Sequence, residues 1–241
     1  MAHAEMPRQQ LEPHIPSYAR KVEQLGDVVT DLDQEIQWWL ARGVGPWLTL
    51  GPYTIKHTEY LGKPTQPRLI LAFCQVGGVQ LEIIQPLNDA PSPYRDFFVA
   101  GKSRLHHCAY YVESDYQRAL EDIVAAGETV QLKMWAGAEY TYVALRTPMD
   151  PLLQQIEIDP GKAEAVREWI RDSSDQICNV LELIEFTPDI RGLFARVTEA
   201  AATWDGTTNP VRHLVSPLES AAFEAQLVLD NIEGWFKEWR S

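Results

Sequence analysis

The chain of 241 residues is 45% hydrophobic, which is enough to bury a sizeable core. Its 21 Lys and Arg residues against 34 Asp and Glu residues give a net charge of −13, which argues against nucleic acid and anionic membranes as partners. The three cysteines (Cys74, Cys108 and Cys178) lie far apart, which excludes a disulfide framework and predicts a reducing, cytoplasmic location.

The first part of the chain predicts a surface arm followed by one β-rich module over residues 21–86. Residues 1–20 carry three prolines and no hydrophobic period, as expected of an arm. A strand over 22–29 precedes a helix that is capped at its start by Asp31 and at its end by Gly43. Runs separated by Gly and Pro then predict strands at 47–50, 53–60, 68–76 and 79–84.

The same order of elements restarts after a proline-rich connector over 87–104, in which a short helix is expected. A strand over 107–112 leads to a helix that starts at Ser114 and ends at Gly127. Further strands are expected at 129–135, 140–145 and 152–158, which closes a second module over 105–159. Beyond it the strand pattern stops, and residues 160–241 are expected to form a helical extension packed on the β-rich part or on a partner subunit.

Equal spacings indicate that the two modules are copies of one unit. Seven positions separate Gln24 from the helix cap at Asp31, and seven separate His107 from the cap at Ser114. In each copy an apolar strand followed by proline is expected to close the module. The sequence therefore predicts an α+β fold built from a duplicated strand–helix–strand–strand–strand unit.

Four stretches resemble the vicinal oxygen chelate superfamily, which includes glyoxalase, methylmalonyl-CoA epimerase, bleomycin- and fosfomycin-resistance proteins and extradiol dioxygenases. The stretches are Gln24–Leu32, Gly43–Trp47, Gln80–Pro86 and Leu105–Tyr110, and the resemblance covers roughly residues 20–158. It implies two βαβββ modules whose first strands lie side by side and whose sheets curve into a cup. It also implies a divalent metal ion held by Gln24, Glu82, His107 and Gln155.

This chain departs from the family pattern at Gln155, where metal-dependent isomerases of the family usually carry a glutamate. An amide cannot act as a general base at neutral pH, and the nearest acid is Glu157. Such a ligand set suits Mg, Mn, Fe, Co, Ni or Zn without selecting among them. The expected catalytic residues are His107, Glu82, Glu157, His57 and Tyr142. The expected substrate-binding residues are Trp47, Phe73, Tyr111, Trp135 and Tyr140.

The leading hypothesis for function is a metal-assisted isomerase, epimerase or lyase acting on a small apolar or aromatic carbonyl or oxygenated substrate. Two alternatives stay open: a metal-independent acid/base enzyme that uses His107 and Glu82, and a non-catalytic binding protein of the resistance type. Extradiol oxygenation fits less well, because it needs two histidines and the frame supplies only His107. The long amphipathic run near the C-terminus favours a homodimer, and no apolar run approaches the roughly 20 residues of a membrane span.

Overall fold

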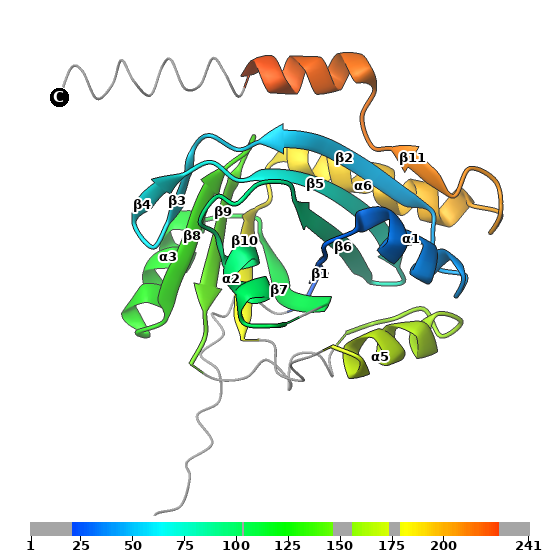
Figure 1. The fold of residues 1–241 in the computed structure, drawn as a ribbon, viewed down its shortest axis with the longest axis horizontal. Helices are drawn as coiled ribbons and strands as arrows, with labels where there is room; N and C mark the ends of the chain where they lie inside the picture. The colour runs from blue at the N-terminus through cyan, green and yellow to red at the C-terminus, as the bar shows by residue number, and fades with distance from the viewer. Residues whose placement is uncertain (1–20, 103, 147–155, 174–178, 227–241) are drawn as a thin grey trace, which may run out of the picture.

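The fold is described by a computed structural model over residues 21–102, 104–146, 156–173 and 179–226. Its central feature is one 11-stranded sheet with the strand order β11-β2-β5-β6-β1-β7-β10-β9-β8-β3-β4. The sheet is strongly curved (Figure 1), and side chains pack on both of its faces. The expected arm over residues 1–20 lies outside the described residues.

The first module contains the elements expected from the sequence. They are β1 (Gln24–Val28), α1 (Leu32–Leu40), β2 (Trp47–Thr54), β5 (Arg68–Val76) and β6 (Val79–Pro86), with a hairpin of β3 (Thr58–Tyr60) and β4 (Lys63–Thr65) inserted after β2. Asp31 caps α1 by accepting a hydrogen bond from the Gln34 backbone N–H at 2.9 Å. Gly43 follows the helix with a φ of +73°, a conformation that glycine adopts without strain.

The second module repeats this order but closes with a strand that lies much later in the chain than expected. It contains β7 (Arg104–Val112), α3 (Tyr116–Ala125), β8 (Thr129–Trp135), β9 (Glu139–Ala144) and β10 (Val180–Glu185). Residues 147–155 lie outside the described part, and residues 156–158 are not a strand. The closing strand expected at 152–158 is therefore wrong. Helix α5 (Ala163–Arg171) lies in the segment between β9 and β10.

The two modules meet at their first strands, as the resemblance implies. β1 pairs with β7 in antiparallel fashion, and each of these strands pairs in parallel with the last strand of its own module. Helix α3 starts one residue later than expected, because Asp115 rather than Ser114 occupies the N-cap position. The α+β fold of two βαβββ modules is thus confirmed, with a corrected last strand.

Helices α1, α3 and α5 pack on one face of the sheet. Three fully buried tryptophans lie in this layer, where Trp39 packs against both Trp47 and Trp169. The indole N–H of Trp169 donates to a carboxylate oxygen of Asp27 at 3.0 Å, which fixes α5 to the end of β1. The helix layer therefore contains one buried acid among apolar groups.

The opposite, hollowed face of the sheet is covered by later parts of the chain. The connector forms α2 (Pro93–Val99), as expected, and its Tyr94 and Phe97 pack into this face. After β10 come α6 (Pro188–Thr203), the short strand β11 (Val211–His213) and a helix over 217–226. The expected helical extension is thus present as α5, α6 and the helix over 217–226, but β10 interrupts it after α5 and joins the sheet. Within the described residues, no helix is long and apolar enough to cross a membrane.

Candidate metal centre

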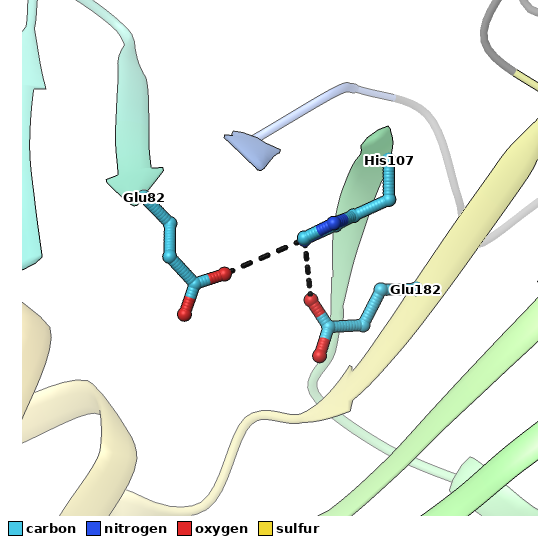
Figure 2. A group of neighbouring side chains, drawn as sticks. All are labelled: Glu82, His107 and Glu182. Carbon is cyan, nitrogen blue, oxygen red and sulfur yellow. Dashed lines mark ion pairs between the residues drawn. The ribbon is translucent and has the colours of Figure 1, made fainter. Parts of the chain in front are cut away.

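Three buried side chains from three different strands converge on the hollowed face of the sheet (Figure 2). They are Glu82 of β6, His107 of β7 and Glu182 of β10. Nε2 of His107 lies 3.1 Å from Oε2 of Glu182 and 3.4 Å from Oε2 of Glu82. One ligand atom from each residue lies within 4.8 Å of the other two, which is the arrangement required of a mononuclear metal site.

Strand register explains why these residues meet. Glu82 pairs with Gly26 on β1, and Glu182 pairs with Ala109 on β7. Gly26 lies two positions after Gln24, and Ala109 lies two positions after His107. Glu82 and Glu182 are therefore equivalent in the two modules, as are Gln24 and His107.

Gly26 makes room for the imidazole ring of His107. A Cβ atom built on Gly26 would lie 1.7 Å from Cε1 of His107, far inside van der Waals contact. The ring thus lies directly over the glycine backbone and is fully buried, with 0% of its residue surface exposed. The ring of Tyr142 packs edge-on against it, at 5.1 Å between centroids.

The two carboxylates control the charge on the histidine. Burial alone lowers the pKa of His107, but its contacts with Glu182 and Glu82 outweigh this effect and raise the pKa to about 10. Burial raises the pKa of Glu82; the contact with His107 lowers it, and the neighbouring Glu182 raises it. Without a metal ion, the site therefore holds an imidazolium between two acids.

Several polar atoms of this site are buried without a directed hydrogen bond. They are Nε2 of His107, Oε2 of Glu182 and Oε1 of Gln24. The 3.1 Å separation between His107 and Glu182 is thus a close ion pair whose N–H does not point at the oxygen. Buried polar atoms are costly unless they are paired, and one nitrogen with carboxylate and amide oxygens suits a divalent cation. The residues present fit such an ion.

Gln24 lies next to this group but is engaged by another amide. Its Nε2 donates to Oε1 of Gln80 at 2.8 Å, and the hydroxyl of Tyr111 also lies 3.4 Å from that oxygen. Gln24 is 1% exposed, and its own Oε1 has no hydrogen-bond partner. The hydrogen bond to Gln80 uses Nε2 of Gln24, so the side-chain amide oxygen Oε1 of Gln24 is available to a ligand.

A cavity of about 390 Å³ opens beside the three residues, with Glu82 and Glu182 in its lining. Most of the lining is aliphatic or aromatic, and the described lining residues include neither Lys nor Arg. Of the expected site residues, Tyr142, Phe73, Trp135 and Tyr140 line this cavity. Tyr111 instead stacks on Phe186, at 4.5 Å between ring centroids.

The C-terminal part of the chain forms one wall of this cavity. Phe194 of α6 and Phe223 of the helix over 217–226 line it, together with Glu219 and Gln226. The hydroxyls of Tyr53 and Ser220 lie 2.7 Å apart and join this helix to β2. The extension therefore packs on the cup rather than away from it.

Besides Tyr111, three other expected site residues lie outside the cavity, and Gln155 is not described. Trp47 is buried in the helix layer on the other face of the sheet, where its indole N–H donates to the Val44 carbonyl oxygen. His57 follows β2 and does not line the cavity; its ring packs edge-on against Trp135, at 6.3 Å between centroids. Glu157 has 81% of its side chain exposed and lies 3.8 Å from Lys21. The structure therefore places these three side chains away from the metal centre and its cavity, and Gln155 lies outside the described residues.

Glu182 is the residue of the metal centre that sequence reasoning missed. Leu181-Glu182-Leu183-Ile184 nearly repeats Leu81-Glu82-Ile83-Ile84, so an acid inside an apolar run was a usable signal for Glu182. Tyr94 lines the cavity from α2, is fully buried, and its hydroxyl has no hydrogen-bond partner of good geometry. Nothing in its local pattern distinguishes it from a core aromatic residue.

Comparison with known proteins agrees with this architecture. Residues 23–144, half of the chain, match the Glyoxalase/Bleomycin resistance protein/Dioxygenase superfamily. Similar solved structures include a hypothetical protein from Bacillus halodurans C-125, at 16% identity and a TM-score of 0.40, covering 68% of this chain and 93% of that one. Another is methylmalonyl-CoA epimerase from Mycobacterium tuberculosis, at 16% identity and a TM-score of 0.39, covering 73% and 94%. No protein of curated function matches the chain significantly. The chain therefore belongs to the Glyoxalase/Bleomycin resistance protein/Dioxygenase superfamily.

Proposed function

We propose that this protein is a metal-dependent enzyme that moves a proton at a carbon next to a carbonyl group of a small apolar substrate. Isomerases, epimerases and lyases of this kind share that step. The observation that carries the proposal is the buried Glu82–His107–Glu182 group in the wall of an apolar cavity. Perturbed titratable groups in a cleft of this kind mark functional sites.

Glu82, His107 and Glu182 would hold a divalent ion, with Gln24 as a fourth ligand through its unpartnered Oε1. When bound, such an ion acts as a Lewis acid that polarises a substrate oxygen. Two carboxylates give the site two formal negative charges, one more than the ligand set expected from the sequence. We therefore expect tighter cation binding than a site with a glutamine in the last strand would give.

The residues of the chain have separable roles toward the substrate. Glu82 and Glu182 both border the cavity, so a carboxylate oxygen there is placed to take a proton from a bound molecule. Burial raises the pKa values of Tyr142 and Tyr140, and the nearby Glu182 raises them further. These phenols stay neutral and act as hydrogen-bond donors to substrate oxygens rather than as bases.

The cavity lining favours an apolar or aromatic body on the substrate. The lining includes Leu69, Leu71 and Phe73 of β5 and Trp135 of β8, strands on the two sides of β1 and β7 in the sheet order. A volume of about 390 Å³ suits a small molecule. Because no Lys or Arg occurs among the described lining residues, a phosphate-bearing substrate finds no cationic partner there.

The metal-independent enzyme and the non-catalytic binding protein were considered because the sequence placed an amide, Gln155, in the last strand of the second module. In the sheet, Glu182 occupies that place, so a carboxylate is available both to bind a cation and to move a proton. An extradiol dioxygenase is disfavoured because its iron site needs two histidines and one carboxylate, whereas this group has one histidine and two glutamates. These observations favour the metal-dependent enzyme.

The first test is metal binding by the full chain after chelation, with Mn²⁺, Co²⁺ and Zn²⁺ titrated separately. We expect one equivalent to bind at micromolar concentration or tighter, and Glu82→Ala, His107→Ala and Glu182→Ala to lose it. Glu59→Ala is the matched control, because Glu59 is an exposed strand glutamate outside the site. Unchanged binding in all three site variants would contradict the proposal.

The second test is proton exchange. The metal-loaded protein is incubated in D₂O with a panel of aryl and alkyl ketones, α-hydroxyketones and 2-substituted β-keto acids. NMR should show deuterium entering at the carbon beside the carbonyl in at least one member, and Glu182→Gln should abolish it. Stoichiometric binding of a compound that is recovered without deuterium would instead support a binding protein.

A further inference from the structure

Strand β7 contains a bulge where it passes the metal centre. Gly26 of β1 pairs with His107, but the next residue, Asp27, pairs with Leu105, so His106 is the extra, unpaired residue. Successive side chains of a regular strand point to opposite faces. Here the two imidazole rings instead turn toward each other, with centroids 5.3 Å apart and Nδ1 atoms 3.0 Å apart.

The His106 ring is held on both sides. It is 3% exposed and packs against Tyr94 and Phe97 of α2. It also hydrogen-bonds the backbone of Pro93, which has no N–H, so the proline carbonyl oxygen must accept. Because Nδ1 of His106 faces His107, the donor to Pro93 is Nε2–H.

A hydrogen bond between two ring nitrogens needs a hydrogen on one and a lone pair on the other. Nε2 of His107 faces the carboxylates of Glu82 and Glu182, and an imidazole that binds a cation through Nε2 carries its ring hydrogen on Nδ1. With Nε2–H given to Pro93, His106 presents an Nδ1 lone pair. The shared hydrogen therefore belongs to Nδ1 of His107.

We propose that His106 is a positioning residue that accepts the Nδ1–H of His107 and thereby directs Nε2 of His107 at the metal centre. The inference rests on the proposed metal site, in which only Nε2 faces Glu82 and Glu182. The Pro93 carbonyl oxygen at the start of α2 would thus fix the ring of His106, and His106 would in turn fix the ring of His107. Partners of this kind fix the tautomer and ring orientation of a metal-ligating histidine.

The experiment combines side-chain ¹⁵N NMR of the metal-free wild-type chain with Zn²⁺ titration of variants. His106→Phe keeps an aromatic ring but removes the acceptor, and His106→Asn places a side-chain oxygen near the position of Nδ1. His57→Phe is the control, because His57 lies outside the cavity. We expect NMR to show His106 protonated at Nε2 alone, with Nδ1 accepting from His107. We also expect His106→Phe to weaken Zn²⁺ binding about 10- to 100-fold, with His106→Asn restoring most of it.

Three results would overturn the inference: a proton on Nδ1 of His106, unchanged Zn²⁺ affinity in a folded His106→Phe variant, or equal losses in both variants, since the last result would show packing alone. If His106→Phe does not fold, the wild-type NMR pattern decides. A wild-type chain that binds no Zn²⁺ would instead overturn the proposed function, whereas the NMR pattern, recorded without metal, tests the role of His106 separately.

Discussion

Gly26 is the residue on which the metal centre depends most directly, although it contributes no side chain. Its missing Cβ leaves the space that the ring of His107 occupies. We expect Gly26→Ala to displace the ring and to weaken divalent-metal binding at least about 10- to 100-fold, as loss of a ligand's support does. Titration with Zn²⁺ measures this. Gly192→Ala is the control, because that exposed glycine in α6 has open space around it.

Proton release offers a second check at the residue scale. The pKa of His107, about 10 without metal, means that at pH 7.5 a cation must displace its Nε2 proton. Calorimetry in buffers of different ionisation enthalpy should show at least one proton released per ion bound. The affinity for the divalent ion should rise with pH until the pH exceeds the pKa of His107, about 10. Binding without proton release would show that His107 is already neutral.

The same pKa has a consequence for the metal-free fold. Because the pKa of His107 is raised above its ordinary 6.5, its contribution to stability is fully present below pH 6.5 and is lost as pH rises through about 10. Glu182→Gln should remove part of that dependence, because one of the two carboxylates that raise the pKa is lost. Denaturant titrations of the metal-free protein at pH 6 and pH 9 measure the difference.

Sequence reasoning at this scale identified Glu82, His107 and the equivalence of Gln24 with His107. Glu82 stood in an apolar strand, and Gln24 and His107 stood on strands that precede a helix cap. Strand register bears out their equivalence, although the second cap is Asp115, one residue later than expected. It failed for Trp47 and His57, because a strand pattern does not say which face of a curved sheet a residue near a bend will occupy. His57 comes after a register shift in β2 between Leu50 and Tyr53, which no local pattern indicates.

Among the elements, the helix over 217–226 should set how much apolar substrate the cavity accepts. Phe223 lines the cavity and packs on Tyr53, at 5.0 Å between ring centroids. We expect Phe223→Ala to weaken binding of a neutral apolar fluorophore, N-phenyl-1-naphthylamine, about tenfold, because roughly 1–2 kcal/mol of apolar contact is lost. Leu218→Ala is the control on the same helix, since Leu218 is 81% exposed. Equal affinities would exclude this helix from the binding site.

Helices α1 and α5 enclose an acid whose charge state should affect stability. Burial raises the pKa of Asp27 well above its ordinary 3.8, and the nearby Glu35 raises it further. The folded protein therefore binds this proton more tightly than the unfolded chain does. Stability consequently falls as pH rises from about 3.8 through the raised pKa of the folded state.

Asp27→Asn should remove this pH dependence while leaving an oxygen to accept from Trp169. We expect the variant to gain stability relative to the wild type at pH 8 and to gain little at pH 4.5, as measured by chemical denaturation. A constant difference between the two proteins across this range would show that Asp27 is charged in the folded state.

At the scale of the whole molecule, duplication made most of the fold predictable, because two copies of one pattern support each other. The last strand was placed wrongly for a physical reason: the first module closes through a tight turn at Gly77 and Gly78, and the second was assumed to do the same. It closes instead after the segment that carries α5. Local pattern contains no information on the length of such an insertion.

The homodimer expected from the sequence stays a prediction. Light scattering after size exclusion should give twice the 27.4 kDa mass of one chain. A mass equal to one chain at micromolar concentration would contradict it.

The late position of β10 in the chain also sets an order of assembly. In the sheet β10 lies between β7 and β9, but in the sequence both of those strands, and then α5, come before β10. Pairings between distant segments form slowly because a long loop must close first. Glu82 and His107 belong to strands made earlier, so the site becomes complete only when β10 enters the sheet. Acquisition of metal-binding capacity during refolding would therefore report the closing of the sheet.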